Sequence, residues 1–133
     1  MKRIFSLFTP LLVLSVIACS NGQTQTASND LPPKVFDQKM KELNNEILLD
    51  VRTVREYKDG HLLNSINIDW NGDNFDAEVA KLDKTKPVFV YCYAGGRSSE
   101  AADAMRKAGF KQVYNLDGGI QDWRTAGLPE TKE

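Results

Sequence analysis

VFVYCYAGGRSS, at residues 88–99, places three patterns in a row. An apolar, β-rich segment, Val88–Tyr91, ends at Cys92, and a short loop with two glycines and one arginine follows. An alanine-rich helical pattern then runs over Glu100–Ala108. This order predicts a thiol at the N-terminus of a helix, where converging backbone N–H groups stabilise anions, including a thiolate.

The loop after Cys92 has residue types that suit such a cradle. Glycines at 95 and 96 accept positive φ, which lets neighbouring N–H groups point inward. An arginine and the helix N-terminus both lower the pKa of a thiol from its ordinary value near 8.5. The alternative is a small cysteine buried for packing alone. The candidate binding loop is therefore Tyr93, Ala94, Gly95, Gly96, Arg97 and Ser98, with Ser98 or Ser99 expected to cap the helix.

Short apolar segments alternate with helical patterns on both sides of this loop. Such alternation predicts an α/β domain with a mostly parallel sheet and helices on both faces. Ligands bind such sheets at the carboxyl ends of the strands, which is where Cys92 lies. The expected strands are Ile47–Val51, Ser65–Ile68, Val88–Tyr91 and Val113–Leu116, and the expected helices are Phe36–Leu43, Thr53–Lys58, Asp76–Leu82, Glu100–Ala108 and Ile120–Ala126.

The beginning of the chain has the pattern of an export signal. Lys2 and Arg3 precede a mostly apolar run over 4–17, which is short for a membrane span. A buried N-terminal helix is the alternative interpretation. The residues before Cys19 resemble a bacterial lipobox, which implies cleavage and lipidation at Cys19; ordinary cleavage would instead leave a free thiol. The expected division is a signal peptide (1–18), a lipidated cysteine and flexible tether (19–33), one domain (34–127) and a C-terminal tail (128–133).

Composition excludes several classes of function. Removal of residues 1–18 leaves Asp and Glu in excess over Lys and Arg, which argues against nucleic acid as a partner. Membrane attachment would then come from the lipid anchor rather than from surface charge. Cys19 and Cys92 are the only cysteines, so an acylated Cys19 leaves no intramolecular disulfide. One histidine and one remaining thiol give no usual zinc ligand set, and we expect neither metal nor cofactor.

Three motifs carry a resemblance to a known family. The segment 49–62, LDVRTVREYKDGHL, is similar to the first signature of single-domain rhodanese-like sulfurtransferases. Cys92–Ser98 resembles their active-site loop, Cys-x-x-Gly-x-Arg, and 115–123, NLDGGIQDW, resembles their closing Gly-Gly-x-x-x-Trp. The motifs occur in the family's order and extend over nearly all of 34–127. The resemblance implies a three-layer rhodanese-like fold.

The same resemblance implies a reaction. Cys92 would take a sulfane sulfur from a small donor, become a persulfide, and pass the sulfur to cyanide, a small thiol or a protein thiol, as in thiosulfate:cyanide transfer. Asp50 and Arg52 would support the loop through hydrogen bonds or an ion pair. Their alternative role is a purely structural pair at the strand end.

Two other functions remain open from the sequence. Cysteine phosphatases of related fold separate Cys from Arg by five residues, whereas four lie between Cys92 and Arg97. A membrane-tethered rhodanese-fold binding module without catalysis is the second alternative. With its export pattern, the chain is expected to be lipid-anchored and to face the periplasm or the outer cell surface.

Overall fold

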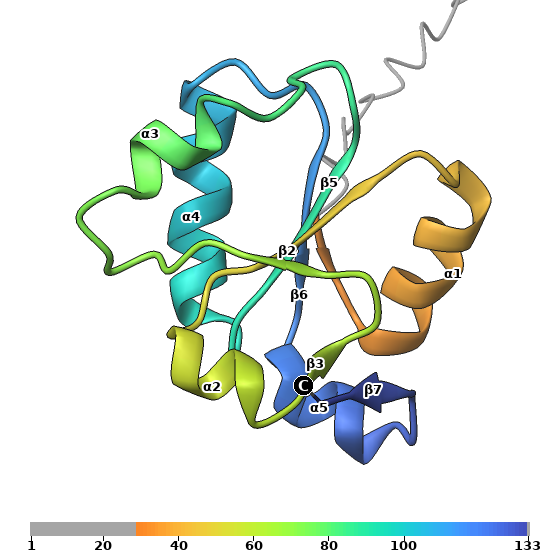
Figure 1. Cartoon of the computed structure of the whole chain (residues 1–133). Helices are drawn as coiled ribbons and strands as arrows, with labels where there is room; N and C mark the ends of the chain where they lie inside the picture. The colour runs from red at the N-terminus through yellow and green to blue at the C-terminus, as the bar shows by residue number, and fades with distance from the viewer. Residues whose placement is uncertain (1–28, 133) are drawn as a thin grey trace, which may run out of the picture.

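The computed structural model describes residues 29–132, and its centre is a five-stranded sheet (Figure 1). All neighbouring strands of this sheet pair in parallel, which confirms the predicted α/β class. In spatial order the strands are β1 (Asp30–Leu31), β6 (Val113–Leu116), β5 (Val88–Tyr91), β2 (Ile47–Asp50) and β4 (Ile66–Asn67).

Helices cover both faces of the sheet, so the fold has three layers (Figure 1). One face carries α1 (Pro33–Leu43) and α5 (Gly119–Thr125), and the other carries α3 (Phe75–Val79) and α4 (Gly96–Lys107). The short α2 (Val54–Lys58) follows β2. A small antiparallel pair, β3 (His61–Leu62) with β7 (Glu130–Thr131), lies beside the main sheet.

The two faces of β5 hold the two halves of the core. Val88 and Val90 belong to the apolar cluster under α3 and α4, whereas Phe89 and Tyr91 belong to the cluster under α1 and α5. Phe36 of α1 meets Phe89 edge to face, with ring centroids 5.0 Å apart. All of β5 is fully buried, as a central parallel strand requires, so Cys92 at its end has a rigid support.

Strand pairing extends beyond the expected domain range of 34–127 at both ends, in the main sheet at the N-terminal side and in the small antiparallel pair at the C-terminal side. Asp30–Leu31, expected in the tether, pairs with β6, and Glu130–Thr131, expected in the tail, pairs with β3. Each strand is two residues long, too short for its alternation to be visible in the sequence. The predicted signal peptide and lipidation site at Cys19 lie outside the described residues.

Helix starts also differ from those expected. The structure begins α4 at Gly96 rather than Glu100, and Gly95 is its N-cap residue. The expected cap by Ser98 or Ser99 is wrong, because both residues lie inside the first turn.

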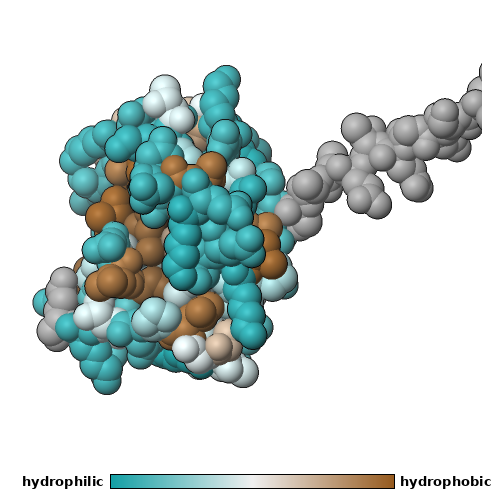
Figure 2. All heavy atoms as spheres, turned by 90° about the vertical axis from the view of Figure 1, so that its right-hand side faces the viewer, coloured by the Kyte–Doolittle hydropathy of each residue, from teal (hydrophilic) through white to brown (hydrophobic). Residues whose placement is uncertain are grey.

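Within residues 29–132, no helix has the length and apolar character needed to cross a bilayer. Apolar residues reach the surface between hydrophilic ones on the face seen in Figure 2.

Candidate active site

Cys92 is the first residue after β5, in the loop that joins β5 to α4. Its Sγ accepts hydrogen bonds from the Gly95 N–H at 3.1 Å and from the Ser98 hydroxyl at 3.3 Å. The Cys92 residue is 2% exposed, so the thiol is enclosed by its own loop. The predicted arrangement of a thiol facing the start of a helix is therefore present, with the sulfur deeper than the sequence indicated.

Hydrogen-bond donors decide the charge of this thiol. Burial on its own raises the pKa of Cys92, because a thiolate loses its solvation. The Ser98 hydroxyl and the backbone N–H groups of Ser98, Gly95 and Ala94 act in the opposite direction and hold the pKa below the ordinary value. The net effect favours the thiolate, the nucleophilic form of cysteine.

Backbone hydrogen bonds from the start of α5 hold the Cys92 loop in place. The N–H of Ile120 donates to the Cys92 carbonyl at 2.9 Å, and the N–H of Gln121 donates to the Tyr93 carbonyl at 3.1 Å. With these carbonyls held toward α5, the following N–H groups can face the sulfur. Gly119 makes the approach possible: its φ is +59°, and a Cβ there would lie 2.6 Å from the Cys92 carbonyl oxygen and closer still to that of Tyr93.

The loop residues differ in what they do. Gly95 has a φ of +100°, as predicted, whereas Gly96 is an ordinary helical residue with open space around it. Ser98 is fully buried and touches the thiol itself. Tyr93 is 47% exposed, so it lies at the surface of the loop.

Arg97 points to a carboxylate rather than to the sulfur. Its Nη1 and Nη2 donate to the two oxygens of Glu56 at 2.9 and 2.8 Å, a bidentate pair across 41 residues of sequence. This hydrogen bonding with Arg97, helped by Thr53, holds the pKa of Glu56 at about 2. Glu56 in turn raises the pKa of Arg97, and the nearby charges of Cys92 and Asp69 add to that shift.

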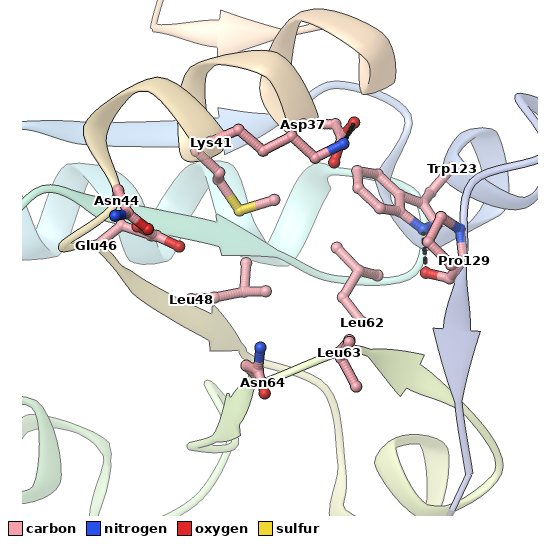
Figure 3. A pocket seen from close by; sticks show the side chains of 11 residues that line it. Asp37, Lys41, Asn44, Glu46, Leu48, Leu62, Leu63, Asn64, Trp123 and Pro129 are labelled. Atoms are coloured by element: carbon pink, nitrogen blue, oxygen red, sulfur yellow. Dashed lines mark hydrogen bonds and ion pairs between the residues drawn. The ribbon is translucent and has the colours of Figure 1, made fainter.

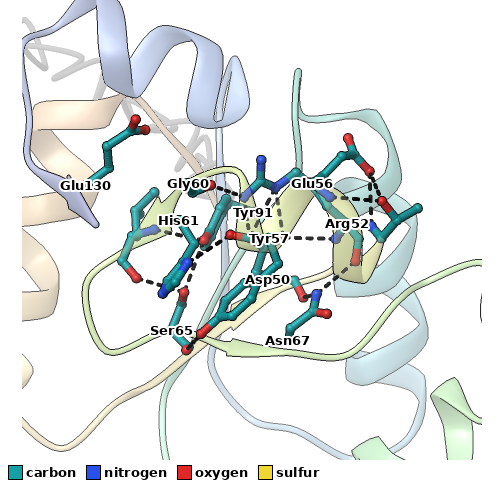
Figure 4. A network of polar contacts seen from close by, with 12 residues as sticks. Asp50, Arg52, Glu56, Tyr57, Gly60, His61, Ser65, Asn67, Tyr91 and Glu130 are labelled. Atoms are coloured by element: carbon teal, nitrogen blue, oxygen red, sulfur yellow. Dashed lines mark hydrogen bonds and ion pairs between the residues drawn. The ribbon is translucent and has the colours of Figure 1, made fainter. Parts of the chain in front are cut away.

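Asp50 and Arg52 form the ion pair that the sequence suggested (Figure 4). Arg52 Nη2 lies 2.6 Å from Asp50 Oδ2 and also donates to the Gly60 carbonyl at 2.7 Å. Both side chains are buried, and Asn67 donates to the carbonyls of both residues. The pair joins the end of β2 to the chain after α2, which favours a supporting role over contact with substrate.

The single histidine belongs to this supporting network. His61 is buried, its ring stacks on Tyr57 with centroids 3.7 Å apart, and its Nδ1 bonds the Tyr57 carbonyl at 2.9 Å. Tyr57 in turn donates its hydroxyl to the Ser65 carbonyl at 2.6 Å. These contacts indicate that His61 supports the fold rather than the chemistry at Cys92.

Two residues of the site were not identified from the sequence. The Thr53-x-x-Glu56 spacing is a capping box, and the structure contains it, but nothing in the spacing names Arg97 as a partner. Gly119 is part of the closing motif, yet its contact with the Cys92 loop depends on the packing of α5. Residues 29–132 contain no group of three or more His, Cys, Asp or Glu side chains placed to hold a metal.

A separate cavity of about 310 Å³ lies between α1 and the segment around β3 (Figure 3). Leu48, Leu62 and Trp123 line its apolar part, and Lys41 with Asp37 stands at its α1 side. None of its lining residues comes from the loop 92–98, so this cavity is not part of the thiol site.

Comparison with known sequences decides the family. The family model described as "Rhodanese-like domain" matches residues 32–126. The chain belongs to the rhodanese-like family. A relative named thiosulfate sulfurtransferase GlpE, from Pseudomonas savastanoi pv. phaseolicola, is 34% identical over 101 residues, which cover 76% of this chain and 92% of that protein. At family level the rhodanese-like chain is thus a sulfurtransferase.

Two further comparisons agree with this assignment. A Bacillus subtilis protein named putative sulfur carrier protein YrkF is 31% identical over 103 residues, 77% of this chain and 55% of that protein. The crystal structure of a rhodanese-related protein from Thermoplasma volcanium superposes with a TM-score of 0.69 at 28% identity, covering 78% of this chain and 98% of that chain. The fold of the rhodanese-like chain is therefore the family fold.

Proposed function

We propose that the protein transfers a sulfane sulfur through a persulfide on Cys92, with thiosulfate:cyanide transfer as an activity measurable in vitro. The observation that carries the proposal is the enclosure of Cys92 Sγ by the Gly95 N–H and the Ser98 hydroxyl, which favours the thiolate. Binding of the transferred sulfur is assigned to the loop of Tyr93, Ala94, Gly95, Gly96, Arg97 and Ser98, with Asp50 and Arg52 in support.

The first step forms one S–S bond and breaks another. The Cys92 thiolate attacks the outer sulfur of thiosulfate, the bond from that sulfur to the sulfite group breaks, and sulfite leaves with the bonding electron pair. The product is Cys92–S–S⁻. Backbone N–H groups at the start of α4 would stabilise the charge on the outer sulfur, as they do for other anions.

The second step returns the thiolate. Cyanide, or the thiolate of an acceptor, attacks the outer sulfur, and the electron pair of the S–S bond goes back to Cys92 Sγ. The outer sulfur stands about 2 Å beyond Sγ, one S–S bond length. Because Sγ is enclosed, the outer sulfur is the atom that an acceptor can reach, which favours transfer over formation of a mixed disulfide with Cys92.

Intact mass spectrometry tests the persulfide. After incubation with thiosulfate or a polysulfide, the protein should gain one sulfur atom, and cyanide should remove it with formation of thiocyanate. Cys92→Ser should gain none while remaining folded. A protein that gains no sulfur from any donor would instead be a non-catalytic binding module.

We also propose that the protein is exported and lipid-anchored through Cys19, facing the periplasm or the outer cell surface. The basic residues Lys2 and Arg3, the apolar run after them and the lipobox-like residues support this. When the full chain is expressed in a bacterial host, the membrane fraction should contain a chain that begins at Cys19 and carries acyl mass. The variant Cys19→Ala should lose that mass, and an uncleaved chain in the soluble fraction would contradict the proposal.

A further inference from the structure

The loop after Cys92 carries a cation, Arg97, whose charge is already matched by a carboxylate. Arg97 is the only basic residue between 92 and 98, and both of its terminal nitrogens are bonded to Glu56. The side chains of Arg97 and Glu56 are 27% and 32% exposed, so the pair lies at the surface rather than in the core. A molecule approaching the thiol therefore meets an ion pair and not a free guanidinium.

Glu56 is also held in place by hydrogen bonds from Thr53, at the start of its own helix. The backbone N–H and the hydroxyl of Thr53 both donate to Glu56 Oε2, at 3.0 and 2.9 Å, in the capping box that begins α2. Releasing Arg97 toward a bound anion would leave the Glu56 carboxylate in place beside that anion. The negative charge of Asp69 also raises the pKa of Arg97, so a second carboxylate lies near this pair.

The reacting sulfur lies near enough to this pair for its charge to act on Arg97. Cys92 is 2% exposed, and its charge interacts with that of Arg97, so the two ends of the loop share one electrostatic environment. Neutral donors, the backbone N–H groups and the Ser98 hydroxyl, hold the thiolate from inside. The site thus stabilises one negative charge on sulfur while offering no unpaired loop cation to a second anion.

We propose that Glu56 determines acceptor specificity by charge: among thiols that take the sulfur from Cys92, it disfavours those with a negatively charged side group and favours neutral or positively charged ones. This inference rests on the proposed persulfide reaction and names the acceptor class for it. In the step concerned, the acceptor thiolate sulfur bonds to the outer sulfur of Cys92–S–S⁻. The S–S bond breaks, and its electron pair returns to Cys92.

A series of small thiols that differ in the charge of their side group tests the effect of acceptor charge. The protein is first loaded with a polysulfide, and discharge is followed by intact mass with cysteamine, 2-mercaptoethanol or 3-mercaptopropionate, which carry a positive, no and a negative side group. Rate constants in Glu56→Gln are divided by those of the unmodified sequence for each thiol, which cancels their different nucleophilicities. We expect this ratio to be roughly fivefold higher for 3-mercaptopropionate than for cysteamine, the effect of one charge at close range in a solvated site.

The control variant is Glu42→Gln on α1, which removes an equally charged, exposed carboxylate away from the loop. Its ratios should be equal for the three thiols. Equal ratios for Glu56→Gln would overturn the inference, although loading with sulfur would still support the proposed function. A protein that fails to load at all would overturn both.

Salt dependence gives a second readout that needs no variant. In the unmodified protein, added salt should speed discharge by 3-mercaptopropionate and slow discharge by cysteamine, because screening weakens the repulsion in one case and the attraction in the other. A salt response of the same sign for both thiols would contradict selection by charge.

Discussion

Tyr91 and Cys92 are consecutive residues with opposite acid–base behaviour. Both are buried, on opposite faces of the same strand end, and burial by itself raises the pKa of each. The negative charge of Asp50 adds to that rise at Tyr91, whose pKa lies far above its ordinary value. At Cys92 the hydrogen-bond donors of the loop outweigh burial, so the pKa is lowered rather than raised. For these two equally buried acids, the surrounding hydrogen-bond donors and charges, rather than exposure, decide whether the pKa is lowered or raised.

The surroundings of the two residues also differ in construction. The hydroxyl of Tyr91 accepts from the Leu62 N–H at 3.0 Å and lies 3.1 Å from the Ser65 hydroxyl, while Arg52 stands over its ring. This Tyr91 side of the strand end is a network of buried side chains that includes a full ion pair. The Cys92 side is made mainly of backbone N–H groups. We therefore expect changes on the Tyr91 side to act on stability and changes on the Cys92 side to act on reactivity.

The largest effect should come from breaking the ion pair on the Tyr91 side. Arg52→Ala leaves the Asp50 carboxylate buried and unpaired, which we expect to lower the free energy of unfolding by about 3–5 kcal/mol in urea denaturation. The matched control is Arg124→Ala, which removes an exposed partner of Glu130 and should cost at most about 1 kcal/mol. Equal losses in the two variants would show that the Tyr91 network does not stabilise the fold.

Gly119→Ala should come next, and it should affect both stability and reactivity. The new Cβ would overlap the carbonyl oxygens of Cys92 and Tyr93, so the loop must shift and its N–H groups turn away from the sulfur. We expect a loss of about 2 kcal/mol or more in unfolding free energy, together with slower alkylation of Cys92.

Gly127→Ala separates backbone strain from overlap. Gly127 has a similar φ of +71°, but a Cβ there would meet nothing within 4 Å. Its cost should therefore be about 1 kcal/mol, with Cys92 alkylation unchanged. If Gly127→Ala slowed alkylation as much as Gly119→Ala, contact between α5 and the loop would not be what orients the thiol site.

A smaller change should follow from the loss of one donor. Ser98→Ala removes the hydroxyl that lies 3.3 Å from Cys92 Sγ, so the pKa of the thiol should rise. We expect alkylation at pH 7 to slow by about tenfold, the value of one hydrogen bond to a charged group. Ser99→Ala is the control, since no side-chain hydrogen bond of Ser99 is formed to the sulfur, and its rate should match that of the unmodified protein.

The smallest effect should be the acid response of Glu56. Its pKa is lowered in the folded state from 4.5 to about 2, so its contribution to stability is complete above pH 4.5 and is lost as pH falls through about 2. Unfolding temperatures measured between pH 5 and 2 should therefore fall less in Glu56→Gln than in the unmodified protein. Parallel curves would show that the pair with Arg97 adds nothing to the fold.

The sequence predicted the parts of the site that depend on local pattern. A four-residue apolar run followed by Cys92 and glycines was enough to place the thiol at the carboxyl end of a parallel strand, before a helix. The start of that helix was predicted four residues late, because Gly96, Ser98 and Ser99 are weak helix formers that tertiary packing makes helical.

Contacts between distant segments could not be predicted in this way. Glu56 and Arg97 are 41 residues apart and meet only because α2 and α4 start at the same edge of the sheet. Ser98 has the residue type of a helix cap, but its position in the first turn directs its hydroxyl to the sulfur instead. Three of the two-residue strands, β1, β3 and β7, owe their existence to their partners rather than to their own residues.

The most direct measurement is the pH dependence of Cys92 alkylation by iodoacetamide, followed by intact mass. Because the cradle lowers the pKa of this thiol, the rate should reach half of its plateau at a lower pH than the rate for an ordinary cysteine in a short peptide measured alongside. Ser98→Ala should move that midpoint upward. A midpoint at or above that of the peptide cysteine in the unmodified protein would contradict the account, since burial would then dominate Cys92 as it dominates Tyr91.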